Sequence, residues 1–447
     1  MKLKKVIILI VVFILSFFVI DKAVEKRVHI YFEDLLSSSQ RNFVKKYLAP
    51  YKYISRQDRI IANYYNMDLK FKNSNKDILV GEMKEQNLSN NKILKRYNLV
   101  NGFYLGMNYV FPGSGFIDFD NDNLLALSSR GVLGYTKDLE SDLSFKQIKN
   151  NIDQYINLDQ FLKNNSFSLK DLLIFEGKIF VSYSEEIEED CWNTSVLMAN
   201  MNYKNINFEK LFSPNECVHS FKNRDRAFHP HPAGGRIVAV DSDHVVLTTG
   251  PYRSRFLAQD KKSVNGKLIK ININNSNYKI ISMGHRNPQG LYYDRDNDFL
   301  LETEHGPQGG DEINLIELND IVDDEIPNYG WAIVSAGEHY GGKIPRNEEK
   351  YKKYPLYKSH SKYGFIEPLK SFVPSIGISE ITKVKNNKYV ASSLKDKSLY
   401  FFELKEKKIV SMERVEVFER VRDLRLKNNK LYLFLEDTPS IGVINMQ

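Results

Sequence analysis

Four positively charged side chains lie beside short apolar segments of the kind that form β-strands. If the fold brings them to one site, they repel one another unless an anion is bound between them. An arginine guanidinium pairs with a carboxylate through two hydrogen bonds, and lysine adds a point charge, so the set predicts a multiply charged anionic ligand. Taken singly, each is typical of a solvated surface charge. The four are Arg286, Lys395, Arg420 and Arg422.

Two histidines and a glycine-rich segment add further candidate chemistry. His229 and His231 precede Gly234, and an imidazole is the side chain most often used to accept a proton near neutral pH. Residues 306–312 combine glycine and proline with two acids, and a turn of this composition exposes backbone carbonyl oxygens. Such hard oxygen donors suit Ca²⁺ better than Zn²⁺. The alternatives are ordinary loop histidines and a purely structural turn.

Six copies of one local pattern indicate the fold that must position these residues. From about residue 100, a polar turn repeatedly precedes a short apolar or β-branched strand, most copies being roughly 40 to 65 residues apart. Asn, Asp and Gly in the turns tolerate the left-handed backbone of tight hairpins. The spacing predicts an all-β, six-bladed β-propeller, whose loops meet at one mouth of a central channel. A pair of β-sandwiches is the alternative.

The N-terminus is typical of an export signal. Lys2, Lys4 and Lys5 precede an apolar run over residues 6–20, which is interrupted by Ser16. This pattern predicts a signal peptide or an uncleaved signal anchor within residues 1–22, with the body of the protein outside the cytoplasm. We therefore expect a protein that is periplasmic, or anchored to the membrane and facing the periplasm.

The remaining chain divides into two parts by its patterns. Residues 23–97 contain helix-compatible stretches and few strand signals, which predicts a helical extension; the propeller is expected over residues 98–447. The net charge of +7 is mild for 447 residues, and no basic run carries interleaved aromatics, so we expect no nucleic-acid partner. Export would permit a disulfide between Cys191 and Cys217, but two free thiols are also consistent with the sequence.

Three motifs, taken in order, resemble a known family. They are similar to motifs of the soluble glucose/sorbosone dehydrogenases, and within that family to the aldose sugar dehydrogenases. The family is built as a six-bladed propeller and typically uses pyrroloquinoline quinone (PQQ) with Ca²⁺. The resemblance is good over residues 225–440, thin over residues 100–225 and absent before them. The motifs are GHRNPQG at 284–290, EHGPQGGDEINL at 304–315 and NYGW at 328–331.

The resemblance implies roles for individual residues. His231 would remove the proton of the sugar's anomeric hydroxyl as hydride leaves the same carbon for the quinone, giving a lactone. Asp311 would lie beside the active site, and Gly306 and Pro307 would offer carbonyl oxygens to the cofactor-bound Ca²⁺. The three carboxylates of PQQ would explain the cations, and the reduced cofactor would pass electrons to a quinone or a cytochrome. The implied cofactor contacts are Arg286, Asn287, Lys395, Arg420 and Arg422.

Two features depart from the family's pattern. The family places its catalytic histidine one residue closer to the Gly–Arg pair than His231 stands here, and His229 lies behind it. A glycine- and leucine-rich segment that the family carries in an early blade is not recognisable. A non-catalytic propeller that binds a ligand is therefore the alternative to a sugar dehydrogenase. A lactonase has little support, because no ring of Asp, Asn and Glu for Ca²⁺ is evident.

Overall fold

The computed structural model describes residues 15–16, 40, 67–107, 113–164, 166–318 and 325–446. Six antiparallel sheets follow one another along the chain, which confirms the predicted six-bladed β-propeller. One edge strand of each sheet is the innermost, and each innermost strand contacts that of the next sheet. The last innermost strand contacts the first, so the ring is closed. These six strands are β4, β8, β14, β18, β22 and β26.

The first three sheets occupy the chain up to residue 283. The first contains β4 (Gly115–Asp120), β5 (Asn123–Ser128), β6 (Leu133–Thr136) and β7 (Ser144–Asn150), and β7 also pairs with β1 (Ile78–Leu79) and β11 (Asn205–Ile206). The second contains β8 (Leu169–Phe175), β9 (Lys178–Glu188), β10 (Cys191–Asn200) and β12 (Glu209–Phe212), with β13 (Val218–His219) beside β10. The third contains β14 (Gly234–Asp241), β15 (His244–Thr249), β16 (Lys267–Asn272) and β17 (Tyr278–Met283).

The last three sheets complete the ring. The fourth contains β18 (Pro288–Asp294), β19 (Phe299–Glu304), β20 (Asp311–Glu317) and β21 (Lys370–Phe372). The fifth contains β22 (Ile378–Lys385), β23 (Lys388–Ser393), β24 (Ser398–Lys405) and β25 (Lys408–Glu416). The sixth contains β26 (Val421–Lys427), β27 (Lys430–Leu435), β28 (Ser440–Asn445), β3 (Ile93–Asn98) and β2 (Lys84–Asn87). The short helices are α5 (Leu158–Lys163), α6 (Glu348–Lys353), η3 (Ile152–Gln154), η4 (Arg255–Gln259), η5 (Pro345–Asn347) and η6 (Ser361–Tyr363).

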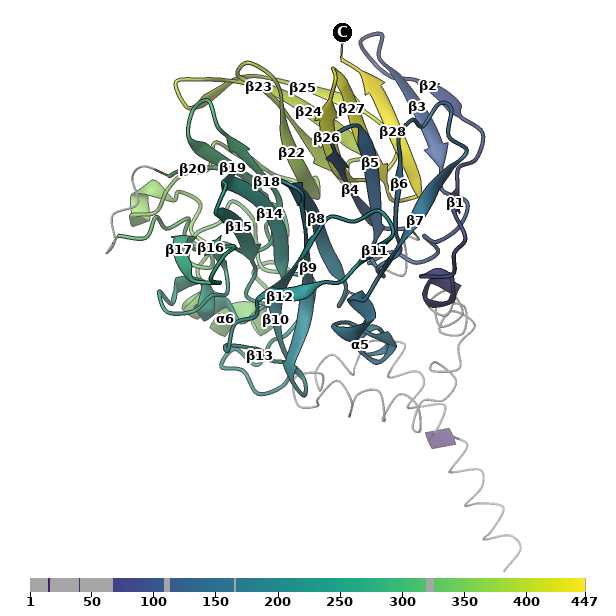
Figure 1. Cartoon of the computed structure of the whole chain (residues 1–447). Coiled ribbons are helices and arrows are strands. Elements are labelled where there is room, and N and C mark those ends of the chain that lie inside the picture. Colours follow the sequence, from purple (N-terminus) through teal and green to yellow (C-terminus); the bar gives the residue numbers. More distant parts are fainter. Residues whose placement is uncertain are drawn as a thin grey trace, which may run out of the picture.

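The sixth sheet combines both ends of the described chain. Strand β3 pairs with the C-terminal strand β28, and Figure 1 shows β2 and β3 beside the yellow strands of the C-terminus. The sequence predicted a helical extension up to residue 97, so the expectation for residues 84–97 was wrong. The six residues of β3, Ile-Leu-Lys-Arg-Tyr-Asn, do not alternate polar and apolar types, so without the partner strand β28 the pattern does not distinguish a strand from a helix.

The predicted tight turns join the strands of several blades. Two-residue hairpins place Asn121, Asn386, Asn428 and Asn429 at positive φ. Asparagine tolerates this left-handed backbone better than most residues, which explains its recurrence before the strands. Packing follows the alternation of the strands. In β5, Leu125 and Leu127 join one buried cluster, whereas Leu124 and Ala126 point the other way into a second cluster.

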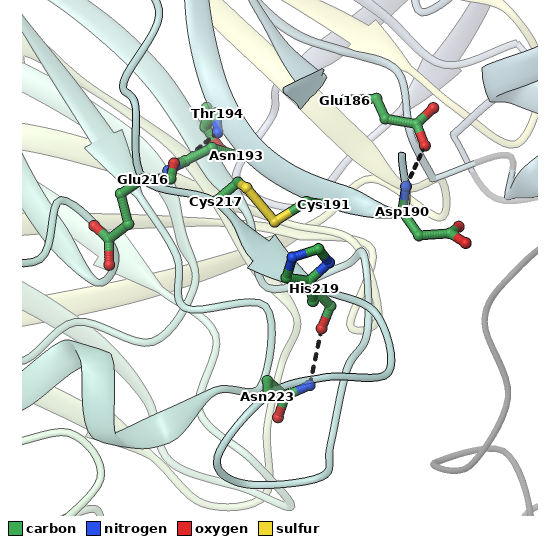
Figure 2. Close-up of a disulfide and its surroundings, with 9 residues drawn as sticks. All are labelled: Glu186, Asp190, Cys191, Asn193, Thr194, Glu216, Cys217, His219 and Asn223. Atoms are coloured by element: carbon green, nitrogen blue, oxygen red, sulfur yellow. Dashed lines mark hydrogen bonds between the residues drawn. A yellow bond between two sulfur atoms is a disulfide. The ribbon is translucent and has the colours of Figure 1, made fainter. Parts of the chain in front are cut away.

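A disulfide between Cys191 and Cys217 joins the start of β10 to the segment before β13, so the pairing that the sequence left open is present (Figure 2). Val218 and His219 pair with the first two residues of β10, which holds this outer loop against the second blade. The predicted export signal lies outside the described residues apart from positions 15 and 16. Within the described part of the chain, no helix has the length and apolarity needed to cross a membrane.

Candidate functional site

A cavity lies where the innermost strands begin. Its wall takes residues from β4, β8, β14, β18 and β26, together with the loops that precede or follow strands of other blades. The predicted residues His231, Asn287, Arg420 and Arg422 therefore meet around one space although the chain separates them widely. The polar side chains of the lining are Ser166, Lys170, His231, Arg236, Asn287, Gln289, His305, Arg420 and Arg422.

β-Bulges direct several of these side chains into the cavity. The register of β8 with β9 shifts between Leu169 and Asp171, which leaves Lys170 as the extra residue. The same irregularity occurs around Gln289 in β18 and around Arg422 in β26. A bulge re-aims a side chain and increases the local twist, and such bulges are common beside active sites. Lys170, Gln289 and Arg422 thus occupy equivalent positions in three blades, and all three line the cavity.

A chain of hydrogen bonds connects one side of the wall. Arg422 Nη1 donates to Gln289 Oε1 over 3.2 Å, and Gln289 Nε2 donates to Asn287 Oδ1 over 3.2 Å. The Asn287 amide lies 3.4 Å from His305 Nδ1. His305 Nε2 is buried and has no hydrogen-bond partner among the described residues. The wall therefore presents one imidazole nitrogen that a ligand could satisfy.

The two arginines of the sixth blade share one carboxylate. Arg420 Nε donates to Glu436 Oε2 over 2.9 Å, and Arg422 Nη2 donates to Glu436 Oε1 over 3.0 Å. Burial alone would raise the pKa of Glu436, but Arg422 and Arg420 outweigh it and hold the pKa below its usual range. Glu436 is therefore a carboxylate at neutral pH, and it balances one of the two positive charges.

Lys170 adds a further positive group to the same cavity. Its side chain is buried, and its Nζ donates to the backbone oxygen of Ser166 over 2.6 Å. Burial, and then the charges of Arg422 and Arg130, lower the pKa of Lys170 to about 7. The sequence analysis did not single out this residue. The signal was a charged pair, Lys170-Asp171, at the start of an otherwise apolar strand.

The ring of His231 meets the solvent, although protein atoms crowd around it. This crowding, followed by the charges of Lys170 and Arg253, lowers the pKa of His231 to about 3. The imidazole is therefore neutral at physiological pH. The His229 ring packs edge-on against that of His231, 4.4 Å between centroids, and His229 Nδ1 accepts a hydrogen bond from the backbone of His231. His229 thus supports the loop from behind.

Two predicted cofactor contacts lie outside the lining of this cavity. Arg286 donates to the backbone oxygen of His305 over 2.6 Å and stacks over the Trp331 ring at 5.4 Å. It lines a second, smaller cavity behind His305. Lys395 is exposed, and its neighbour Leu394 supplies the lining instead. The structure therefore does not gather all four predicted cations around one space.

The glycine-rich segment borders the second cavity. Gly306 is part of its lining with Arg286 and His305, and Pro307 follows directly. Both residues are buried, and within the described part of the chain neither the Gly306 nor the Pro307 carbonyl accepts a hydrogen bond. Asp311 is fully buried and lies outside both linings.

The contacts of Asp311 indicate how it acts. Its carboxylate accepts bonds from the backbone nitrogens of Gly306 at 3.1 Å, Gly377 at 2.6 Å and Ile378 at 3.1 Å. It also accepts a bond from the Ser375 hydroxyl. With its lone pairs used in this way, Asp311 fixes the glycine-rich loop against the start of the fifth blade. This geometry supports a positioning role rather than the predicted catalytic one.

A buried ion cluster lies next to the cavity, further along the innermost strands. Arg236 Nη1 is 2.8 Å from Asp171, 2.9 Å from Glu380 and 3.0 Å from Asp423. Arg425 pairs with Asp423 at 3.0 Å and with Asp118 at 3.4 Å. We call these six residues the central ion cluster. Because acids surround both of its arginines, the cluster serves to hold five innermost strands together.

Comparison with known proteins gives a consistent result. The family model described as Glucose / Sorbosone dehydrogenase matches residues 174–443. An uncharacterized protein of Synechocystis is 29% identical over 199 residues, covering 43% of this chain and 40% of the relative. An aldose sugar dehydrogenase of Escherichia coli strain K12 is 24% identical over 284 residues, covering 58% of this chain and 71% of the relative. The chain thus spans less than half of the Synechocystis relative.

A solved structure agrees on the fold. The PQQ-bound form of an aldose sugar dehydrogenase from Streptomyces coelicolor superposes with a TM-score of 0.50 at 15% identity. The match covers 83% of this chain and 96% of the other. At this identity the likeness concerns the propeller architecture alone.

Proposed function

The chain belongs to the glucose/sorbosone dehydrogenase family, and we propose that it oxidises the hemiacetal of an aldose to a lactone with PQQ as the hydride acceptor. The observation that carries this proposal is the charge of the cavity. Lys170, Arg420 and Arg422 line it, and the two arginines share the carboxylate of Glu436. An anion with several carboxylates matches this excess of positive charge.

The residues present fit such a cofactor. Arg422 and Arg420 would hold its carboxylates, and Asn287 and Gln289, which are hydrogen-bonded in sequence to Arg422 on the same side of the wall, would add amide donors. His305 Nε2, which is buried without a partner, would bond to a polar atom of the ligand. Gly306 and Pro307 would supply carbonyl oxygens to Ca²⁺. When bound, the quinone supplies a carbonyl carbon that accepts hydride, and Ca²⁺ would polarise that carbonyl.

The protein's own part in the reaction is to bind, orient and deprotonate the sugar. A proton acceptor must lie within hydrogen-bonding reach of the reacting hydroxyl. The imidazole of His231, which is neutral at physiological pH, lines the cavity and is the proposed proton acceptor. The hydrogen bonds among Arg422, Gln289 and Asn287 restrict their rotamers, so ligand donors are oriented before binding.

The cellular setting is part of the proposal. We propose an exported protein, with a quinone or cytochrome as electron acceptor. The disulfide supports this location, because disulfides persist in oxidising compartments. The alternative is a propeller that binds a polyanionic ligand without chemistry. Two observations favour it, the exposure of Lys395 and the position of Arg286 behind His305.

A dye-reduction assay separates the two functions. The purified protein would be incubated with PQQ and Ca²⁺, and artificial-acceptor reduction measured with a panel of aldoses. We expect sugar-dependent reduction and a lactone product detectable by mass spectrometry. PQQ binding without reduction by any sugar would favour the binding module. The Arg414→Met variant, which changes an exposed surface pair, provides a control for nonspecific effects of removing a charge.

A further inference from the structure

A second buried group of acids lies in the fourth blade. Glu302 and Glu304 are two residues apart on β19, so their side chains point to the same face of the sheet. His285, in the segment between β17 and β18, directs its Nδ1 at both carboxylates, 3.9 Å from Glu302 Oε2 and 3.5 Å from Glu304 Oε1. β18 and β19 are neighbours in this blade (Figure 1). We call these three residues the His285 triad.

Three atoms in and beside the triad are buried without a hydrogen-bond partner among the described residues. They are His285 Nδ1, Glu302 Oε1 and the Oδ1 atom of Asn314 on β20. All three residues are fully buried. A buried polar atom without a partner costs free energy, and a bound water or ion commonly supplies that partner. The presence of three such atoms at one place therefore points to a ligand there.

The charge of the triad favours a cation as this ligand. Its donor atoms all lie within 4.8 Å of one another, so the two carboxylates repel each other where water does not screen them. Within the described part of the chain, no lysine or arginine side chain pairs with Glu302 or Glu304. The nearby Glu312 has its own partner, His360, at 3.5 Å. In the central ion cluster, by contrast, two arginines lie among the acids.

The donor atoms of the triad are those of a transition-metal site. One imidazole nitrogen and two carboxylate oxygens suit Zn²⁺ and related ions, whereas Ca²⁺ takes roughly six to eight oxygen ligands. In a tetrahedral Zn²⁺ site with bonds of about 2.0–2.1 Å, the ligand atoms stand about 3.3–3.4 Å apart. The separations of 3.5 and 3.9 Å from His285 Nδ1 are slightly larger, so small side-chain rotations would close the site around an ion.

Neighbouring groups hold the ligand atoms in place. His285 Nε2 is hydrogen-bonded to the Ser282 hydroxyl at 2.8 Å. A partner on the second ring nitrogen fixes the orientation of a metal-bound histidine. Asn314 Nδ2 donates to Glu302 Oε2 over 3.0 Å and to Glu304 Oε1 over 3.4 Å, so one amide orients both carboxylates. The triad thus has the outer partners that a metal site requires.

We propose that the His285 triad binds one divalent transition-metal ion of the Zn²⁺ class, through His285 Nδ1 and one oxygen each of Glu302 and Glu304. The ion is structural and joins the segment before β18 to the end of β19. It supports the cavity wall from behind, because Glu304 Oε2 also accepts hydrogen bonds from the backbone nitrogens of Arg286 and Asn287. The site is separate from that of the cofactor-bound Ca²⁺ and does not depend on the proposed function.

Metal binding can be tested without any enzyme assay. The full-length protein would be treated with a chelator, returned to buffer with Ca²⁺ in excess to fill sites made only of oxygen, and titrated with Zn²⁺. We expect about one Zn²⁺ per chain after gel filtration, measured by metal mass spectrometry, and a higher Tm on binding. Co²⁺ in place of Zn²⁺ should give the visible absorption band of a tetrahedral site with nitrogen and oxygen ligands.

Two substitutions assign the ion to the triad. Glu302→Gln keeps the shape of the side chain and removes a charged ligand, and His285→Gln removes the nitrogen ligand. Each should weaken Zn²⁺ binding by more than about tenfold, since even replacing a residue behind a metal ligand costs about that much. Each should also abolish the Co²⁺ band. If His285→Gln does not fold, Glu302→Gln alone decides.

Asp241→Asn is the matched control. Asp241 Oδ1 lies 2.7 Å from His244 Nδ1 in a surface pair of the same donor types, and this variant should bind Zn²⁺ like the wild type. Retention by wild type and control, with loss in Glu302→Gln, supports the inference. A folded wild type that binds no Zn²⁺, so that the two carboxylates share a proton instead, overturns it. Equal binding by wild type and Glu302→Gln also overturns it, because the ion then lies elsewhere. None of these results decides whether the protein oxidises aldoses, which the dye-reduction assay tests separately.

Discussion

Two groups of arginines lie close together along the innermost strands, and they differ in what surrounds them. In the central ion cluster, Arg236 and Arg425 are paired with four carboxylates from different blades. In the neighbouring cavity, Arg420 and Arg422 share the carboxylate of Glu436, and no carboxylate in the described part of the chain pairs with Lys170. Four acids accompany two arginines in the first arrangement, whereas two arginines share one acid, Glu436, in the second.

This difference in pairing distinguishes the central ion cluster, which holds strands together, from the cavity, which we propose binds a ligand. Buried charges require partners, and where the protein supplies them the charges hold strands together. Where the protein leaves them short of partners, a ligand of opposite charge completes the set. Arg236 belongs to both regions, since it lines the cavity while its guanidinium is paired with acids of the cluster. The position of an arginine in the sequence does not show whether it holds strands together or faces the cavity.

The largest expected effect is on the cluster. Arg236→Met should lower the free energy of unfolding by about 3–5 kcal/mol, because it leaves buried carboxylates without their partner. Urea denaturation followed by fluorescence would measure it. Arg414→Met removes an arginine whose side chain is 44% exposed, and should cost at most about 1 kcal/mol. Equal losses in the two variants would contradict the role of the central ion cluster in holding the strands together.

A smaller effect is expected where cluster and cavity meet. Gly235 has a φ of 119° and lies against the stem of Lys170, so Gly235→Ala should cost about 2–3 kcal/mol through strain and displacement of the lysine. Gly177 also has a positive φ, of 72°, but nothing lies within 4 Å of an added Cβ. Gly177→Ala is therefore the matched control, and thermal unfolding of both variants isolates the contact. A Gly235→Ala loss no greater than that of Gly177→Ala would remove the argument for a tight fit around Lys170.

The smallest effect concerns pH. Burial raises the pKa of Asp118 to about 6, against the opposing charge of Arg425. The folded state therefore holds this proton more tightly than the unfolded chain, and stability is lost as pH rises from about 4 to about 6. Asp118→Asn should remove this loss of stability with rising pH. The unfolding free energy of the variant relative to the wild type should therefore change by about 1–2 kcal/mol between pH values of about 4 and about 6. If the unfolding free energies of wild type and variant change in parallel with pH, the raised pKa of Asp118 is contradicted. Asp122→Asn, at an exposed position, is the control.

The sequence was informative where structure depends on local pattern. The turns at Asn121, Asn386 and Asn428 were predicted because a left-handed turn requires particular residue types, and six such units indicated six blades. Strand β3 was missed because it is defined by pairing with β28, more than 300 residues away in the chain, and β2 joins the sheet only through β3. No local pattern specifies so distant a partner.

The site was predicted in part for a similar reason. Asn287, Arg420 and Arg422 lie in motifs and line the cavity, as does His231. Lys170 was missed because a bulge aims it inward, and a bulge is a property of two paired strands rather than of one segment. Arg286 lies in the strongest motif, yet its guanidinium donates to the backbone oxygen of His305 from outside the cavity. The direction of this side chain could not be predicted from its place in the sequence.

The central claim is that the cavity binds a cofactor with several carboxylates through its unbalanced cations. Isothermal titration of PQQ into the protein in Ca²⁺-containing buffer, with wild type and Arg422→Gln compared, tests it most directly. We expect one PQQ to bind per chain, and the variant to bind at least about tenfold more weakly, the usual effect of losing a charge-assisted hydrogen bond. No binding to the wild type, or equal affinity in the folded variant, would contradict the account.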